Sequence, residues 1–125
     1  MDSGPQTDTI EIRHIRASGK YGVPAAERAT AQVLEIDVRV YLDLCAAGSS
    51  DRLEDTVNYS YLHKKIVKVV EENSFSLLER LAAEVCAALF EDVRLTAAQV
   101  SVAKPQRLSG ATPVVTLFRR NPTIA

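Results

Sequence analysis

The sequence is poor in cysteine, and Cys45 and Cys86 are its only two thiols. Two cysteines so far apart exclude a disulfide-rich scaffold and a CxxC redox pair. Long apolar runs are also missing, because no stretch approaches the roughly 20 residues that a membrane-spanning helix requires. The N-terminus has neither a basic start nor an apolar stretch, so no secretory signal is expected. These absences predict a cytoplasmic protein with free thiols and no membrane partner.

Histidine is equally scarce, and His14 and His63 belong to no HxH, HExxH or Cys/His cluster. The ligand spacing of a zinc site is therefore missing, and neither a metal nor another cofactor is expected. The five glycines are scattered and form no phosphate-binding loop, and no GxSxG element presents a nucleophilic serine. Cys45 is expected to end an apolar strand and Cys86 to lie within a helix, which favours packing roles over nucleophilic ones.

An excess of one charge is lacking too, because 15 basic and 16 acidic residues give the 125-residue chain a net charge of −1. This balance gives no reason to expect a nucleic-acid partner. Charge is nevertheless uneven, since residues 1–92 hold ten basic and sixteen acidic residues and no acid follows Asp92. The basic residues beyond it are Arg94, Lys104, Arg107, Arg119 and Arg120. A solvated strand edge is the favoured explanation; an anionic ligand or the acidic part of a neighbouring subunit is the alternative.

What the chain does contain is a long alternating segment at residues 33–44. The apolar residues at its even positions are Leu34, Ile36, Val38, Val40, Leu42 and Leu44. A period of two predicts a half-buried strand about 40 Å long, whereas a compact domain of this size has a radius of gyration of only about 14 Å. So long an edge is usually paired or covered. We therefore expect a sheet that continues into another subunit.

Three further strands and two helices complete the predicted fold. Residues 9–18 alternate except at His14-Ile15, where we expect a β-bulge. Loops are expected at 19–31 and 46–57. A helix then follows with Asn58 as its N-cap, and a second begins at a capping box, Ser76-Leu77-Leu78-Glu79. Short strands are expected at 99–103 and 114–119.

This order, strand-strand-helix-helix-strand-strand, defines an α+β fold with a four-stranded antiparallel sheet and two helices on its apolar face. The opposite face, which carries alternating charged residues of the long strand, should be polar. We expect a flexible N-terminal arm at residues 1–8, a single domain at 9–120 and a C-terminal tail at 121–125.

A small set of polar residues at the ends of these elements offers acid–base chemistry. It consists of Glu27, Asn58-Tyr59, Glu79 and Lys104-Pro105. Each has an ordinary alternative: Glu27 and Lys104 as solvated surface charges, Tyr59 as a core residue and Glu79 as part of a capping box. Spacing alone does not rank a site above these alternatives.

The series of motifs from Thr9 to Arg119 resembles the dihydroneopterin aldolase family. The motifs that carry the resemblance are Gly22-Val23 with Glu27 and Gln32, Asp55-Thr56-Val57-Asn58-Tyr59, Ser74-Phe75-Ser76-Leu77-Leu78-Glu79-Arg80-Leu81-Ala82, and Val102-Ala103-Lys104-Pro105. The resemblance implies the tunnelling fold and a homo-octamer of two stacked rings, with sheets continuous between subunits and active sites shared between them.

The sequence departs from the family pattern at several loop positions. Tyr21 stands where a histidine is common, Ala26 where a second acid is common and Ala31 where glycine is common. Leu108-Ser109-Gly110 replaces an Ile-Pro-Gly segment. These changes affect the expected loop shape and substrate preference more than the core chemistry.

The resemblance implies retro-aldol cleavage of 7,8-dihydroneopterin in folate biosynthesis, in which the pterin ring accepts the electrons without a metal or a Schiff base. Glu79 and the backbone of Leu78 would bind the pterin. Lys104 would be the general acid and base, Tyr59 would relay a proton across the subunit interface, and Glu27 would hold the side-chain hydroxyls or Lys104 itself.

Two other functions stay open on the same scaffold. The first is 2′-epimerisation of dihydroneopterin or its triphosphate, because cleavage followed by re-addition on the other face inverts the carbon. The second is a non-catalytic oligomer that binds a pterin or a purine. A zinc-dependent relative such as a pyruvoyl-tetrahydropterin synthase is disfavoured, because the necessary histidines are missing.

Overall fold

The computed structural model describes residues 8–123, which form a four-stranded antiparallel sheet in the order β1-β2-β3-β4. The strands are β1 (Thr9–Gly19), β2 (Gln32–Tyr41), β3 (Ala97–Ala103) and β4 (Val114–Arg120). The helices are α1 (Ala25–Arg28), α2 (Cys45–Ser50), the 3-10 turn η1 (Leu53–Asp55), α3 (Tyr59–Glu72) and α4 (Leu78–Leu89). The predicted α+β fold is therefore confirmed, with three additional short helical segments.

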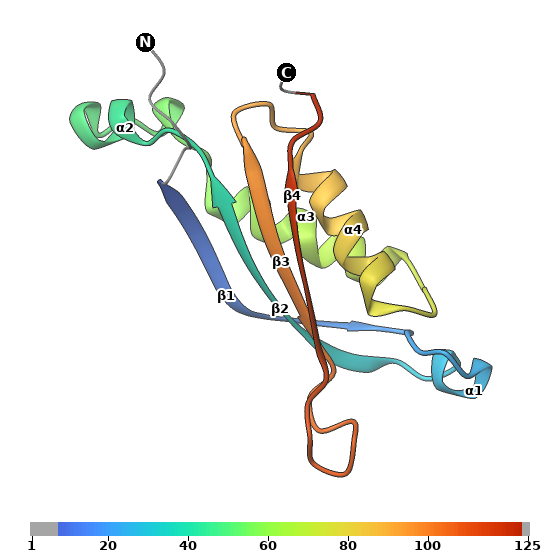
Figure 1. Cartoon of the computed structure of the whole chain (residues 1–125). Helices are drawn as coiled ribbons and strands as arrows, with labels where there is room; N and C mark the ends of the chain where they lie inside the picture. Colours follow the sequence, from blue (N-terminus) through green and yellow to red (C-terminus); the bar gives the residue numbers. More distant parts are fainter. Residues whose placement is uncertain (1–7, 124–125) are drawn as a thin grey trace.

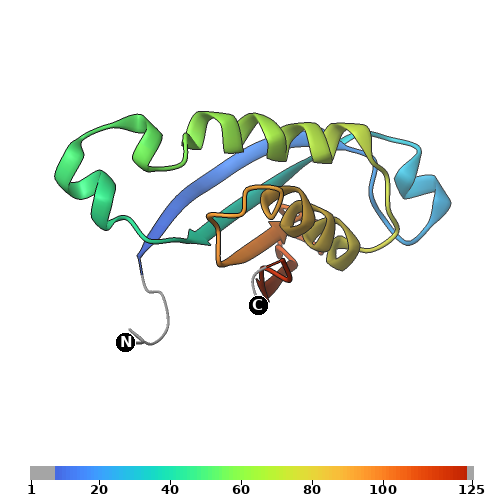
Figure 2. The same ribbon diagram turned by 90° about the horizontal axis from the view of Figure 1, so that it is seen from above.

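The core lies between one face of the sheet and the two long helices. Helix α3 contacts β1, and α4 contacts β3 and β4 (Figures 1 and 2). The alternation in β2 is confirmed, because Leu34, Ile36, Val38 and Val40 are buried while the intervening residues are partly exposed. From the helices, Leu62, Ile66 and Val70 of α3 and Leu81, Val85 and Leu89 of α4 fill the space above them.

The expected bulge in β1 is confirmed as well. The pairing of β1 with β2 shifts between Ile12 and Ile15. Between these two residues, β1 contains one residue more than the facing part of β2. His14 takes a positive φ of 62° there, and its backbone N–H donates to Oδ1 of Asp37 at 2.5 Å. The bulge bends β1, a common effect of an unpaired extra residue.

The end of the long strand and the loop after it were predicted incorrectly. Strand β2 ends at Tyr41, three residues before the predicted Leu44. Cys45 does not end a strand but begins α2, and the expected loop at 46–57 contains most of α2 and all of η1. The physical reason is local: the Asp43 carboxylate accepts a hydrogen bond from the Cys45 backbone N–H at 2.9 Å, which turns the chain into a helix.

The two long helices begin differently. Asn58 caps α3 as predicted, because its side-chain oxygen accepts from the Ser60 N–H at 3.0 Å. The capping box predicted for α4 is wrong: the N-cap is Leu77, and no side chain caps this helix. Ser76 is instead engaged by Arg28, whose Nη1 donates to its Oγ at 3.3 Å, which leaves Glu79 in the first turn of α4 without a capping role.

Both outer strands of the sheet have one edge that no other described strand pairs with. These edges belong to β1, with 11 residues, and β4, with seven. The loop between β3 and β4 extends beyond the end of the sheet, near α1, while α2 lies at the opposite end (Figure 1). Among the described residues, no helix combines the length and apolarity needed to cross a membrane.

The predicted terminal segments fall largely outside the described residues. Of the expected arm at 1–8, only Asp8 is described, and its backbone oxygen accepts from the Leu42 N–H at 3.1 Å. Of the expected tail at 121–125, residues 121–123 are described. Asn121 is buried and its Nδ2 donates to the Leu95 carbonyl at 2.8 Å, so it is joined to the body of the fold. The division at 9–120 stays a prediction.

Candidate active site

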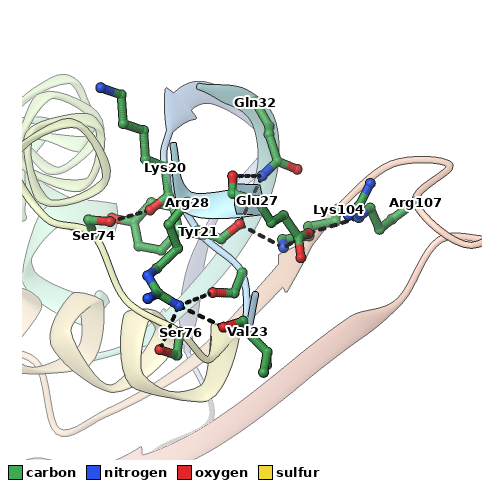
Figure 3. A network of polar contacts seen from close by, with 11 residues as sticks. Lys20, Tyr21, Val23, Glu27, Arg28, Gln32, Ser74, Ser76, Lys104 and Arg107 are labelled. Carbon is green, nitrogen blue, oxygen red and sulfur yellow. Dashed lines mark hydrogen bonds and ion pairs between the residues drawn. The ribbon is translucent and has the colours of Figure 1, made fainter. Parts of the chain in front are cut away.

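A buried ion pair joins the end of β3 to α1. Lys104 is only 7% exposed, and its Nζ donates to Oε2 of Glu27 at 2.5 Å and to the Tyr21 carbonyl at 2.8 Å (Figure 3). Two residues that are 77 positions apart in the sequence therefore meet at one end of the sheet. A lysine withdrawn from water needs such partners, because an isolated buried ammonium is costly.

The position of Lys104 follows from its neighbours in the chain. It directly follows β3, and its backbone N–H still donates to the Pro113 carbonyl at 3.2 Å, so it continues the pairing with the β4 side. A residue that precedes proline avoids helical geometry, and Pro105 therefore keeps Lys104 extended. This geometry carries the side chain past the end of the sheet toward Glu27.

Glu27 is bound by two cations through the same oxygen. Oε2 accepts from Lys104 Nζ at 2.5 Å and lies 2.8 Å from Nε of Arg107. The hydrogen bond from Lys104 is the largest cause that holds the pKa of Glu27 below its usual range; burial opposes it and Arg107 adds to it. Glu27 is therefore a carboxylate at neutral pH and accepts hydrogen bonds from both cations.

Gly22 makes room for this carboxylate. A Cβ at Gly22 would collide with Cγ, Cδ and Oε1 of Glu27, and the glycine has a φ of +154°. The segment around it is fixed by Arg28, whose Nη1 donates to the carbonyls of Gly22 at 2.8 Å and Val23 at 2.7 Å. The same nitrogen donates to Ser76, so the loop before α1 is joined to the start of α4 (Figure 3).

Tyr21, one of the residues that depart from the family pattern, is a core residue that also supports the site. Its side chain is fully buried, and its hydroxyl donates to the Val70 carbonyl at 2.7 Å. Burial raises the pKa of this hydroxyl to about 12, so it stays a neutral donor. Its backbone oxygen accepts from both Lys104 and Nε2 of Gln32, each at 2.8 Å. The tyrosine thus fixes the carbonyl that orients the lysine.

A cleft of about 350 Å³ brings four of the five predicted site residues together. Glu27 and Lys104 line it, as do Leu78 and Glu79 from the start of α4. The remaining lining residues are mostly apolar and include Val23, Leu77 and Leu108, whose side chains are largely exposed. The cleft therefore offers a carboxylate on one wall, an acid–base pair on another and apolar surface between them, which suits a flat heterocycle with a polar substituent.

Tyr59 does not join this cleft within the chain. Tyr59 is the first residue of α3 and is 63% exposed, and it lines a separate cleft of about 680 Å³ together with residues of α2 and η1. The Tyr21 hydroxyl binds Val70 near the other end of the same helix. At 1.5 Å per residue, Tyr59 and Val70 are about 16 Å apart along α3. One chain alone therefore assembles only part of the predicted site.

Sequence analysis missed the role of Arg107, which had been noted only as one of several basic residues. It lines the same cleft and contacts Glu27, three residues after Lys104. The backbone around it takes a tight form, with positive φ at Gln106 and Ser109. A second basic residue two positions after the Lys-Pro motif was the available signal.

The described residues contain no group of three or more His, Cys, Asp or Glu side chains that could hold a metal ion. Cys45 is exposed and Cys86 is buried, and both are free thiols. The groups that the cleft does provide are an ammonium, a paired carboxylate and a second carboxylate. The fold and this cleft together fit a class of enzyme that binds a small heterocycle and moves protons on it.

Comparison with known proteins identifies the family. Residues 10–117 match the family model described as dihydroneopterin aldolase. A Synechocystis protein named a probable dihydroneopterin aldolase is 33% identical over 99 residues, which cover 79% of this chain and 84% of the relative. The dihydroneopterin aldolase of Streptococcus pyogenes serotype M6 is 35% identical over 85 residues, which cover 68% of this chain and 71% of the relative. The chain belongs to the dihydroneopterin aldolase family.

The same similarity extends to solved structures. The structure of the E. coli dihydroneopterin aldolase in complex with neopterin matches this chain with a TM-score of 0.85 at 26% sequence identity. The match covers 90% of this chain and 99% of that chain. The tunnelling fold expected from the sequence is therefore shared, along the whole length of the solved relative.

Proposed function

We infer that this chain is a carbon–carbon lyase that cleaves 7,8-dihydroneopterin into 6-hydroxymethyl-7,8-dihydropterin and glycolaldehyde, a step of folate biosynthesis. The family assignment supports this reaction, and so do the relatives named for it. The observation that carries the inference is the buried Lys104–Glu27 pair in the same cleft as Glu79.

The chemistry needs no added electron sink. The C1′–C2′ bond breaks, and its electron pair moves into the ring imine, whose nitrogen takes a proton. The 2′-hydroxyl loses its proton as glycolaldehyde forms. The resulting enamine is then protonated at C1′ and loses the proton on the ring nitrogen. The enzyme has to hold the ring and to move these protons.

We propose the following roles for the residues of the cleft. Glu79 binds the guanidine-like N–H edge of the pterin through its two oxygens, a charge-assisted contact, and the backbone of Leu78 assists. Lys104 is the general acid and base at the side-chain hydroxyl. Glu27 holds Lys104 and the substrate hydroxyls, which fits its 2.5 Å contact with the ammonium.

We propose that Tyr59 reaches the cleft from a neighbouring subunit. The separation of Tyr59 from Lys104 within one chain supports this, as do the unpaired edges of β1 and β4, which can pair head to tail. A homo-octamer of two stacked rings with shared active sites fits this arrangement. The free thiols Cys45 and Cys86 fit a cytoplasmic location.

The test is to incubate the purified protein with 7,8-dihydroneopterin and to identify the products. Glycolaldehyde and 6-hydroxymethyl-7,8-dihydropterin are expected in equal amounts. If a 2′-epimer is the only product, the protein is an epimerase and not a lyase. If the substrate binds and no product forms, the protein is a non-catalytic oligomer that binds pterins.

Lys104→Ala is the decisive variant for the proposed mechanism. It should lower the rate of glycolaldehyde release by about 10²–10⁴-fold, the range that general acid–base groups contribute, and largely preserve neopterin binding. Lys68→Ala, which removes an exposed lysine from α3, is the matched control and should keep full activity. Full activity of Lys104→Ala would rule out the assigned role.

A further inference from the structure

A second cleft, of about 430 Å³, lies beside the proposed active site. It is lined by Pro24, Ala26, Glu27, Thr30, Gln32 and Arg107. Among residues 8–123, only Glu27 and Arg107 line both clefts, so this ion pair forms the wall between them. The proposed reaction uses the Lys104 side of the wall and leaves the second cleft without an occupant.

The wall carries an excess positive charge. Lys104 and Arg107 contact the same oxygen of Glu27, so two cations share one carboxylate. Lys104 is the closer partner, at 2.5 Å, and is nearly buried, whereas the Arg107 side chain is 48% exposed. Because Lys104 already neutralises Glu27, Arg107 is not required for that purpose. Glu27 is also the only acidic residue in the described part of the chain that lines the second cleft.

The guanidinium of Arg107 has donors to spare. It contacts Glu27 through Nε, and the hydrogen bonds found among residues 8–123 include none from its two terminal nitrogens. A guanidinium held by Nε presents these nitrogens as a planar fork, the geometry that matches two oxygens of a phosphate. Arg107 can therefore hold Glu27 and an anion at the same time.

The proposed binding mode determines which part of the substrate would meet this wall. If the pterin ring lies at Glu79 and the reacting carbon at Lys104, the three-carbon side chain extends toward Glu27 and Arg107, which line the same cleft. We propose that Arg107 is a specificity-determining residue that recognises a phosphate ester on the terminal hydroxyl of the substrate, with the second cleft as the space for the phosphate. This proposal rests on the proposed function and deepens it.

The first test compares cleavage of 7,8-dihydroneopterin and of its 3′-phosphate by the full chain and its variants. In Arg107→Ala, kcat/KM for the phosphate ester should fall by about tenfold or more beyond any fall for the free compound, since charge-assisted hydrogen bonds to phosphate are lost. For Arg107→Lys, kcat/KM for the phosphate ester should lie between the values of the original chain and of Arg107→Ala, because lysine keeps the charge but lacks the planar pair of donors. Lys68→Ala, which removes an exposed charge from α3, should leave the cleavage of both substrates unchanged.

The second test measures binding by calorimetry with neopterin and neopterin 3′-phosphate, which requires no turnover. The unaltered protein should bind the phosphate ester more tightly than neopterin, and Arg107→Ala should abolish that difference. Equal affinities in the unaltered protein would overturn the proposal. The proposal would also be overturned if Arg107→Ala lost affinity for neopterin and neopterin 3′-phosphate equally, since Arg107 would then only position Glu27. If neither dihydro compound is cleaved, the proposed function fails, whereas the binding comparison still decides the role of Arg107.

Discussion

Gly22 controls whether the Glu27 carboxylate can reach Lys104. We expect Gly22→Ala to displace Glu27, because the new Cβ would occupy the space of Cγ and Cδ. A displacement of about 1 Å at a reacting group can lower activity by about 100-fold. The measurement is kcat for dihydroneopterin cleavage, together with a circular dichroism spectrum to establish that the variant folds.

Gly48→Ala is the matched control for this variant. Gly48 lies in α2, and nothing lies within 4 Å of the position of an added Cβ. Alanine is the better helix former, so this variant should be as stable as the original chain or more stable by up to about 1 kcal/mol, with unchanged kcat. Equal activity of the two variants would contradict the packing of Glu27 against Gly22.

The contact of Glu27 with two cations also predicts a pH dependence of stability. Its pKa is lowered in the folded chain, first by the Lys104 hydrogen bond, so the folded state favours the charged carboxylate. The stabilisation is therefore complete well above the unfolded pKa of about 4.3 and is lost as pH falls through the lower folded value.

This dependence can be measured against Glu27→Gln, which cannot ionise. The difference in free energy of unfolding between the original chain and the variant should be constant near pH 7 and should shrink below about pH 4. Urea denaturation at a series of pH values measures it. A difference that stays constant down to pH 2.5 would show that the ion pair contributes nothing to folding.

Among the elements, α3 and α4 differ in how they begin, and this difference is testable. Asn58→Ala should lower the free energy of unfolding by about 1 kcal/mol, the usual cost of a lost N-cap. Ser76→Ala should have a clearly smaller effect, because no side chain caps α4 and Ser76 forms only a 3.3 Å contact with Arg28. Thermal or urea unfolding compares them. If both substitutions lowered the free energy of unfolding equally, Ser76 would act as a cap after all, in contradiction to the structure.

The elements that the sequence predicted correctly depend on local pattern. The alternation in β2 and the cap at Asn58 are properties of neighbouring residues, so they are visible without the fold. The capping box at Ser76 failed because a side chain 48 positions earlier, that of Arg28, engages the serine. Helix α2 was missed because its residues, Cys45–Ser50, are small and carry no apolar period.

The site was predictable only in part for the same reason. The family motifs named Glu27, Glu79 and Lys104, and the structure brings these residues to one cleft. Neither pattern nor resemblance assigned Arg107 to the site, because its contact with Glu27 depends on how the loop between β3 and β4 folds back. The Tyr21 carbonyl was missed because a backbone oxygen has no sequence signature.

At the scale of the whole molecule, shared active sites predict complementation between inactive chains. Tyr59→Phe and Lys104→Ala should each have little activity alone. After equal amounts are unfolded together and refolded, about a quarter of the sites should combine an intact Tyr59 from one chain with an intact Lys104 from its neighbour. About a quarter of the original kcat per site is therefore expected, with light scattering as the measure of assembly.

The controls for this experiment are each variant refolded alone and the two variants mixed without unfolding. Neither should regain activity if subunits do not exchange in the folded state. No recovery in a mixed assembly of the correct mass would contradict the proposal that Tyr59 reaches the cleft from a neighbouring subunit.

The bulge in β1 determines where this edge strand tolerates a change of length. Without His14, the residues Ile10, Ile12, Ile15 and Ala17 would follow one another in strict alternation on the core face. Losing this one residue would therefore straighten the strand and keep its apolar side chains inward. An insertion or deletion in β1 outside the bulge between Ile12 and Ile15 would turn every following side chain to the opposite face. Length variation among related chains should thus concentrate at this one point of the strand.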